Sequence, residues 1–480
     1  MFSIIAKNDK FFLLTILILA FSIRMILAPL YISLPGEAYS VVPHDFVHYV
    51  DDAKAILEGK ILYIAPTHTD GRPAPYGPLF MLVMAGIIKF FGENYLILKI
   101  PAILADVGII VVLFYLTKNL FGSTIARYAT IFYAFSLIPL LISGVDATSD
   151  LPLVFFLITS IFCLTKKNPN IILSAIFLGL SAGFKAPLFL IFLPMTIYYF
   201  IRTKQSRNIF LFASIALLTV VLMNLPFFIK AGTNIFIQII YGLQDPIGGT
   251  SIQSVTNIFV NYFIYGVDER TRLPNPVISQ FSFPLLFTAS LLAFMYIVKF
   301  SLEDKSVELI RNVVLIMIVL TVFVRMSHWH IFYWSVPFIF VLIFYAKQRI
   351  KEFQISNVEI IGILLLVISS IAYAGLYRWT KIPEYTLLEQ TTLFASIFLS
   401  TFGTFLMMVK NNFKKLWSFS TFGWHLWLTD HAKLFMVIGL VVPILKSPAI
   451  AFGTQHFISL TLVVFSNLLL LLFLHKLNEV

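Results

Sequence analysis

Long runs of apolar residues, separated by short polar segments, dominate the chain. A run such as 11–32 is long enough to cross a bilayer as one helix, because about 20 apolar residues are sufficient. The runs that predict crossings are 11–32, 100–117, 123–143, 151–165, 170–184, 186–201, 209–229, 283–300, 311–326, 331–346, 357–376, 389–409, 432–448 and 457–475. This pattern predicts an all-α polytopic membrane protein with about 13 to 14 transmembrane helices.

Positively charged residues lie between these runs and predict the orientation of the chain. Cytoplasmic loops of membrane proteins are enriched in Lys and Arg. The clusters are Lys7 and Lys10; Lys118 and Arg127; Lys166 and Lys167; Arg202, Lys204 and Arg207; Lys299, Lys305 and Arg311; Lys347, Arg349 and Lys351; Lys410, Lys414 and Lys415; and Lys476. Placing them in the cytoplasm puts both termini inside, with the first run expected to be a retained signal anchor.

One apolar segment, 78–91, is predicted to be a helix at the outer membrane surface. A crossing there would move Lys118, Arg127 and every later cluster to the outer face. The alternative is a true crossing that is compensated by one fewer crossing later in the chain. The predicted organisation is a single transmembrane domain over 1–480, with a first outer loop at 33–99 that carries surface helices and a long outer loop at 230–282.

The composition excludes a soluble fold and a nucleic-acid-binding protein. Hydrophobic residues make up 59% of the chain and charged residues only 12%, about half the share found in soluble domains. The net charge of +11 follows from 34 Lys and Arg against 23 Asp and Glu, and the cytoplasmic clusters account for it. Cys163 is the single cysteine, so an internal disulfide is excluded.

The first outer loop contains a segment that predicts a short helix, beginning near Asp45 and ending at Gly59. Asp45 suits the N-cap position, where its carboxylate would accept hydrogen bonds from free amide groups. Alternatively, His44, Asp45, His48 and Asp52 include i, i+4 pairs that place imidazole and carboxylate groups on one helix face. A divalent cation such as Mg or Mn could bind there if three or more ligands converged, so the metal is left unknown.

Further ionisable residues are expected on the outer face, close to the ends of spans. Lys185 lies between two apolar runs, where it either extends its ammonium to the membrane surface or pairs with a phosphate. Arg325, His328 and His330 cluster before a later run, and Arg378 follows another. A pair of histidines at the interface is the structural alternative to a functional role for His328 and His330.

An ordered series of residues over about the first 200 positions resembles a known family. The series is Asp45-Phe-Val-His-Tyr-Val-Asp51, Ala53, Gly59, Leu62-Tyr63, Tyr76, Pro78-Leu79, Gly144, Asp146, Asp150, and Gly183-Phe-Lys185 followed by Pro187. It resembles polyprenyl-phosphate-sugar-dependent glycosyltransferases of the GT-C fold. The similarity is nearest to the mannosyltransferase that starts the GPI-anchor glycan and to related prokaryotic membrane mannosyltransferases.

The resemblance implies a GT-C-like bundle whose first outer loop carries the catalytic carboxylate. Asp45 matches the second acidic position of the family's Asp-x-Asp signature, and Asp51 matches a following Asp in the same helix. Pro43 stands at the first acidic position. This departure weakens the expectation of a metal held by paired aspartates, and it leaves Asp45 as the main candidate base.

The implied reaction moves mannose or another hexose from a polyprenyl-phosphate donor to a glycan, lipid or protein acceptor. A carboxylate would take the acceptor proton, and Lys185, Arg325 and Arg378 would stabilise the leaving lipid phosphate. The remaining residues expected at the substrate site are His328, His330, Asp146, Asp150 and Tyr76. The enzyme is expected in contact with membrane lipid, in the plasma membrane or a eukaryotic endoplasmic reticulum membrane, with its active site on the non-cytoplasmic face.

A second class of function is a lipid-linked oligosaccharide flippase or another secondary transporter. Transporters carry internal repeats and ionisable groups near the middle of the membrane. Asp106, inside a predicted span, is the main residue that favours this alternative. The chain shows no evident repeat and its acidic residues concentrate in the first outer loop, so the transferase is the leading hypothesis.

Overall fold

The computed structural model describes residues 8–31, 44–64, 67, 73–74, 76–236, 248–249, 276–323, 326–327 and 333–349. The chain divides into two compact units. One comprises Met1–Asp245, Ala289–Val319 and His330–Tyr345, and the other Pro246–Thr288, Leu320–Trp329 and Ala346–Val480. The described elements are helices apart from two strands of two residues each.

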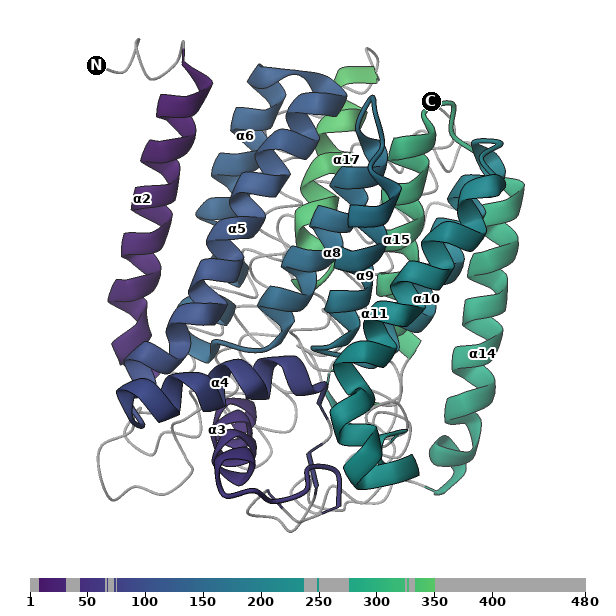
Figure 1. Cartoon of the computed structure of the whole chain (residues 1–480). Coiled ribbons are helices and arrows are strands. Elements are labelled where there is room, and N and C mark those ends of the chain that lie inside the picture. Colours follow the sequence, from purple (N-terminus) through teal and green to yellow (C-terminus); the bar gives the residue numbers. More distant parts are fainter. Residues whose placement is uncertain are drawn as a thin grey trace, which may run out of the picture. The chain divides into compact units, whose positions relative to one another are not determined.

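The first unit begins with α2 (Asp9–Leu27), a 3-10 turn η1 (Ala28–Tyr31), α3 (His44–Leu57), α4 (Pro78–Phe91), α5 (Tyr95–Phe121) and α6 (Ser123–Ala134). It continues with α7 (Leu137–Leu140), a π-helix η2 (Leu141–Asp146), α8 (Asp150–Thr165), α9 (Ile171–Ala182), α10 (Ala186–Arg202), α11 (Arg207–Ala231) and η3 (Gly232–Phe236). Parts of α14 (Pro276–Lys299), α15 (Lys305–Phe323) and α17 (Val336–Arg349) complete it. Figure 1 labels the longer of these helices.

In the first unit, α5 and α8 occupy the centre of the packing. α5 contacts α2, α6 and α8, while α8 also packs along α9, which in turn contacts α10 and α11. The mutual contact buries apolar side chains such as Leu113, Leu157 and Leu178. In the second unit, strand β1 (Gly248–Gly249) pairs in parallel with β2 (Met326–Ser327).

Side-chain caps and glycines define where several helices begin and end. The side chain of Asn94 accepts hydrogen bonds from the backbone of Leu96 and Ile97 and begins α5. Asn170 begins α9 in the same way, through the amide of Leu173. Gly122 follows α5 with φ +88°, a conformation that glycine adopts without a steric penalty, and so it ends that helix.

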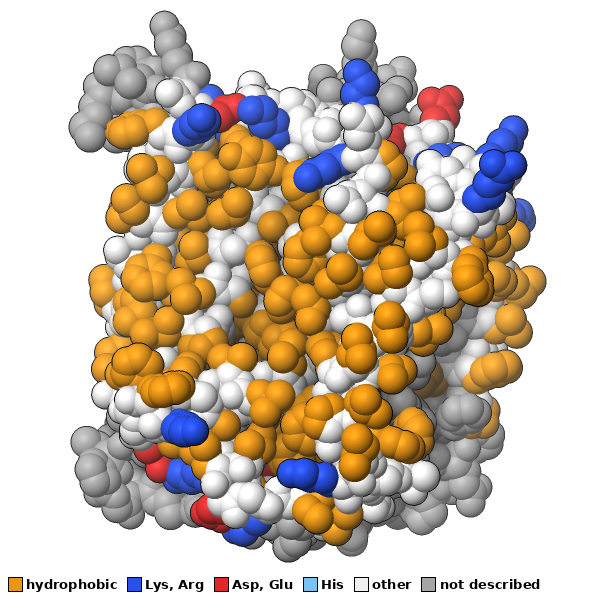
Figure 2. Space-filling view, viewed as in Figure 1, with side chains coloured by type: hydrophobic (Ala, Val, Ile, Leu, Met, Phe, Trp, Pro, Cys, Tyr) orange, Lys and Arg blue, Asp and Glu red, His pale blue; other side chains and the backbone are white. Residues whose placement is uncertain are grey.

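Three described helices are long and apolar enough to cross a membrane, namely Asp9–Leu27, Tyr95–Phe121 and Arg207–Phe236. Hydrophobic side chains cover the middle of the face shown in Figure 2, and Lys and Arg gather toward its margins. On α11, Phe210, Leu222 and Ile229 are strongly exposed, as expected of a helix that faces lipid. The helices near the first ten predicted spans are present, and the last four spans, from 357 onward, lie outside the described residues.

The segment predicted as a surface helix forms α4, a helix of 14 residues. At about 1.5 Å per residue it is roughly 21 Å long, shorter than the hydrocarbon core of about 30 Å. Figure 1 shows α4 lying across the ends of the long helices such as α5, rather than alongside them. Residues 44–57 form the predicted short helix α3, which Gly59 ends with φ +74°.

The span predicted at 123–143 is not one continuous helix. α6 ends at Ala134, and the chain continues through α7 into the π-helix Leu141–Asp146. Pro139 lacks the N–H that a regular helix would use, and the amide of Ala147 bonds the carbonyl of Ile142, five residues earlier, at 2.7 Å. Apolar character alone could not show this interruption, because the residues remain apolar across it.

Two loops that are far apart in the sequence meet through their backbones. The amide of Gly77 bonds the carbonyl of Phe184 at 3.1 Å, and that of Leu79 bonds the carbonyl of Gly183 at 2.9 Å. A Cβ atom on Gly77 would lie only 2.3 Å from the oxygen of Gly183. The start of α4 and the turn between α9 and α10 can therefore meet only if position 77 has no side chain.

We expect Gly77→Ala to separate these two loops, because the added methyl group meets backbone rather than a flexible side chain. Overpacking of this kind costs about 1–3 kcal/mol. Thermal unfolding in detergent can be followed by labelling Cys163, which is buried and is the single cysteine of the chain. The control is Gly86→Ala in α4, where a Cβ meets nothing within 4 Å. Equal stability of the two variants would contradict the prediction.

Candidate functional site

Lys185 lies at the centre of a cluster that the two joined loops build. Its Nζ atom is 2.9 Å from Oδ1 and 3.1 Å from Oδ2 of Asp150, the first residue of α8. It also lies 5.7 Å from the centre of the Tyr76 ring and 5.8 Å from that of Trp334. The ammonium is therefore held by a carboxylate and by two aromatic rings, both of which attract a cation.

Asp150 is wholly buried and receives hydrogen bonds from two elements. Besides Lys185, the indole Nε1 of Trp334 donates to its Oδ1 at 2.6 Å. A buried carboxylate is stabilised when it is paired and hydrogen-bonded in this way. The Lys185 side chain is still 14% exposed, so it can be reached from outside although Asp150 cannot.

Helix α3 docks against this cluster through Tyr49. The Tyr49 ring packs against the rings of Tyr76 and Phe80, with centroids 4.8 and 5.0 Å away. Ser149 donates its hydroxyl hydrogen to the Tyr49 hydroxyl oxygen at 3.0 Å, next to Asp150. Helical periodicity places position 45 on the same face of α3 as Tyr49, one turn earlier. The predicted base thus begins a helix that is fixed to the cluster.

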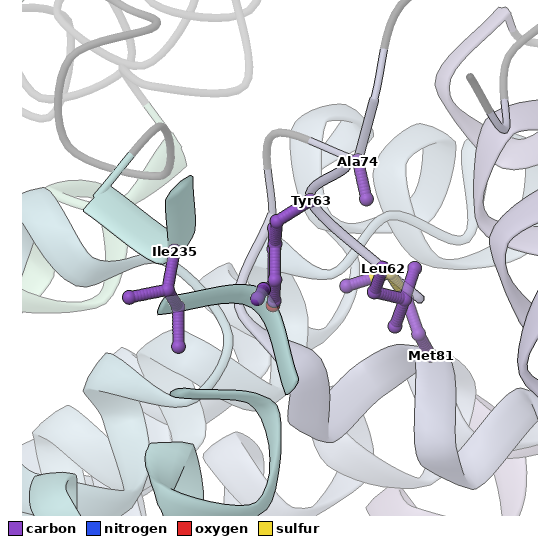
Figure 3. Packing of buried hydrophobic residues seen from close by; sticks show 6 residues of the cluster. Leu62, Tyr63, Ala74, Met81 and Ile235 are labelled. Carbon is purple, nitrogen blue, oxygen red and sulfur yellow. The ribbon is translucent and has the colours of Figure 1, made fainter. Parts of the chain in front are cut away.

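Tyr63 supports the Tyr76 side of the site. Its hydroxyl donates to the backbone carbonyl of Tyr76 at 3.0 Å, and its backbone adopts φ +73°, which is unusual for an aromatic residue. A small apolar cluster holds it there. The buried members are Leu62, Tyr63, Ala74, Met81, Ala231 and Ile235. In Figure 3 the Tyr63 ring lies between Ile235 and the pair formed by Leu62 and Met81.

The environment of Tyr63 keeps its hydroxyl protonated. Burial, and next the carboxylate of Asp52, raise the pKa of Tyr63 well above its usual value. Asp52 is itself wholly buried and accepts a hydrogen bond from the hydroxyl of Thr67. The phenol of Tyr63 is therefore available as a donor to Tyr76 over the whole physiological pH range.

Lys99 of α5 holds the segment before Asp150 in place through hydrogen bonds. Its Nζ atom donates to the carbonyl oxygens of Ala28 and Val145, each at 2.8 Å, and the side chain is only 2% exposed. These carbonyls lie at the ends of α2 and of the π-helix, where a positive charge is favourable. Asp146 is buried nearby and interacts electrostatically with this ammonium.

The structure brings together four of the residues predicted from the sequence and leaves others outside the described part. Lys185, Asp150 and Tyr76 form the cluster, and Asp146 lies in the turn that precedes it. Asp51 is a half-buried residue of α3, and Asp45 is the second residue of that helix, although its side chain is not among those described. Arg325, His328, His330 and Arg378 lie outside the described residues.

Trp334, Tyr49 and Lys99 were not predicted from the sequence. A signal existed for Lys99, since it lies directly beside the predicted run 100–117, where a charge is costly. Trp334 and Tyr49 gave no such signal, because aromatic residues are common at membrane interfaces. Their importance depends on contacts with Asp150 and Ser149 that only the folded chain creates.

The described residues contain no group of three or more His, Cys, Asp or Glu side chains that could hold a metal ion. His48 and Asp52 share a face of α3, but Asp52 already accepts from Thr67.

We expect Tyr63→Phe to loosen the Tyr76 segment, because it removes the hydroxyl and keeps the ring that packs in the cluster. The lost hydrogen bond is worth about 1 kcal/mol. Labelling of Cys163 during thermal unfolding measures the change. Tyr128→Phe, at a ring that is 54% exposed, is the matched control. Identical unfolding of the two variants would show that the Tyr63 hydroxyl does not support the site.

Comparison with known proteins shows a family similar to one segment of the chain and solved structures with a similar fold. Residues 72–230 match the family described as dolichyl-phosphate-mannose-protein mannosyltransferase. No curated protein sequence matches the chain at a significant level. Among solved structures, ArnT from Cupriavidus metallidurans in the apo state aligns with a TM-score of 0.52 at 11% identity, over 95% of this chain and 77% of ArnT. ArnT from the same organism bound to undecaprenyl phosphate aligns with a TM-score of 0.52 at 12% identity over the same shares.

The matched segment contains Tyr76, Asp146, Asp150 and Lys185, whereas Trp334 and Tyr49 of the cluster lie outside it. The structural likeness confirms the predicted all-α, polytopic GT-C fold. The chain therefore has the fold of a multi-pass membrane protein of the GT-C type, and its residues 72–230 are similar to a mannosyltransferase family.

Proposed function

We propose that the protein transfers a hexose, namely mannose, from a polyprenyl-phosphate-linked donor to a glycan, lipid or protein acceptor. The description of the family matched by residues 72–230 supports mannose and a lipid-phosphate carrier. The similar fold of ArnT, solved with undecaprenyl phosphate, supports a prenyl-phosphate ligand. The distribution of charged residues in the sequence supports an active site on the non-cytoplasmic face.

The observation that carries this proposal is the position of Lys185. Its ammonium has three N–H groups, and within the described part of the chain its hydrogen bonds go to the two oxygens of Asp150. Being partly exposed, it can offer a donor to a phosphate at the mouth of the site. Asp150 and Trp334 then act as supports that fix the direction of the ammonium.

The proposed reaction needs a base and a stabilised leaving group. The Asp45 carboxylate takes the proton of the acceptor hydroxyl, whose oxygen attacks the anomeric carbon of the sugar. The bond between that carbon and the phosphate oxygen breaks, and its electron pair leaves with the prenyl phosphate. Because negative charge grows on the phosphate in this step, Lys185 stabilises the transition state more than the bound donor. A single displacement inverts the configuration at the anomeric carbon.

The remaining predicted residues have proposed roles in the same reaction. Arg325 and Arg378 supply further positive charge to the phosphate, and His328 and His330 contact substrate. Asp51 assists Asp45 from the same helix. A divalent cation such as Mg or Mn stays a separate proposal, and no step above is assigned to it.

Replacing Asp45 by Asn is expected to lower turnover about 10²- to 10⁴-fold, the range for loss of a general base. The assay measures mannose transfer from a polyprenyl-phosphate donor in membranes that contain matched amounts of protein. Glu58→Gln, at an exposed carboxylate just after the same helix, is the control and is expected to retain turnover. Unchanged turnover in Asp45→Asn would remove Asp45 from the mechanism.

Lys185→Gln is expected to lower kcat about 10²- to 10³-fold, as does loss of one donor to a developing oxyanion, with a smaller change in KM. The effect on kcat is expected to exceed that on KM because the charge on the phosphate grows only as the phosphate leaves. Steady-state kinetics with the same donor separates the two constants. Lys89→Gln, at an exposed lysine of α4, is the control. A raised KM with unchanged kcat would mean that Lys185 only binds the donor.

A further inference from the structure

A wholly buried polar cluster lies in the first unit, and the proposed reaction does not use it. Arg24 of α2 and Asp106 of α5 form an ion pair with 2.5 Å between Nε and Oδ2, and both side chains are 0% exposed. Arg24 also donates to two backbone carbonyls. The hydroxyls of Tyr133 and Tyr333, both fully buried, complete the cluster. Asp106 is thus paired with a cation within the bundle.

The hydroxyls of Tyr133 and Tyr333 contact each other and also the carboxylate of Asp106. The hydroxyl of Tyr133 is 2.6 Å from Oδ1 of Asp106 and 2.7 Å from the hydroxyl of Tyr333, which is itself 3.2 Å from the same Oδ1. Three contacts share only two hydroxyl hydrogens. The shorter contacts are satisfied when Tyr133 donates to Asp106 and Tyr333 donates to Tyr133. If either hydroxyl is removed, the other can still donate to the carboxylate.

Tyr333 differs from Tyr133 in its neighbour. The next residue, Trp334, donates its indole N–H to Asp150 at 2.6 Å, and Asp150 holds Lys185. Two adjacent residues thus anchor one short turn before α17, at Asp106 on one side and at Asp150 on the other. Tyr133 belongs to α6, whose Ala134 carbonyl is already held by Arg24.

We propose that Tyr333 is a positioning residue for the transfer reaction. Its hydroxyl fixes the turn at residues 333–335 on the Arg24–Asp106 pair, so that Trp334 points its N–H at Asp150 and keeps Lys185 directed at the donor phosphate. The effect on turnover rests on the proposed function, whereas the effect on Trp334 does not. A purely structural cluster would instead stabilise the bundle without any special link to Trp334.

Steady-state kinetics distinguish a positioning role of Tyr333 from a purely structural role. Tyr333→Phe is expected to lower kcat about tenfold with little change in KM, since small misplacement of a catalytic group costs rate. Tyr133→Phe removes an equally buried hydroxyl but leaves Tyr333 able to donate to Asp106, 3.2 Å away, so its kcat is expected to stay within about twofold of the wild type. Incorporation of para-aminophenylalanine at position 333, which keeps a donor, is expected to restore turnover.

The double variants give the decisive comparison. If Tyr333 acts through Trp334, the variant Tyr333→Phe with Trp334→Phe is no slower than Trp334→Phe alone. Effects that multiply instead would overturn the proposal, because independent residues add their effects on the free energy of activation. Tyr133→Phe with Trp334→Phe is the control pair. Labelling of Cys163 verifies that each variant is folded before its rate is compared.

A second measurement does not require the sugar donor or any turnover. The chain has six tryptophans, and fluorine NMR of protein labelled with 5-fluorotryptophan resolves Trp334 as the resonance missing from Trp334→Phe. Tyr333→Phe is expected to shift that resonance, while Tyr133→Phe and para-aminophenylalanine at 333 leave it in place. An unmoved resonance in Tyr333→Phe would overturn the proposal. Absence of turnover in the wild type would instead overturn the proposed function and leave this measurement intact.

Discussion

The energetic cost of placing a charge inside an apolar helix bundle is the constraint on which this structure depends. Arg24 is neutralised by Asp106, and Lys99 directs its hydrogens at two helix-end carbonyls. Each buried cation needs a partner within hydrogen-bond distance. In both cases the partner belongs to an element that is distant in the sequence, so the interaction joins the two elements. The buried charges therefore determine how α2, α5 and the turn before α8 pack, and through that turn they set the position of Asp150.

Lys185 differs from these buried cations in its exposure, and this difference suits the role proposed for it. Arg24 and Lys99 are almost fully enclosed, whereas Lys185 keeps 14% of its side chain exposed while its partner Asp150 is enclosed. An ion pair with one buried and one accessible member has a fixed direction. Such preorganisation means that no reorientation of dipoles is required when charge develops on a substrate, and this is the main source of electrostatic catalysis.

The sequence predicted the parts of the fold that follow from local pattern. The apolar runs located α8, α9, α10 and α11 to within a few residues, and Gly59 correctly ended the helix of the first outer loop. The pattern failed at 123–143, where a proline and a π-helix interrupt a mainly apolar run. Within the site it identified Lys185, Asp150 and Tyr76 but not Trp334. An indole has no distinguishing pattern until the fold places it 2.6 Å from a carboxylate.

At the proposed site, the prenyl chain and the phosphate of the donor would contribute differently to binding and to catalysis. A partly exposed ion pair contributes only about 0–1 kcal/mol, and Lys185 already shares its charge with Asp150. Each buried methylene of a prenyl chain contributes about 0.8 kcal/mol, so a few isoprene units exceed that contribution. Affinity for a prenyl-phosphate donor would then come chiefly from apolar helix surfaces. The ammonium would act mainly when the phosphate gains charge, and this is the condition under which binding energy accelerates a reaction.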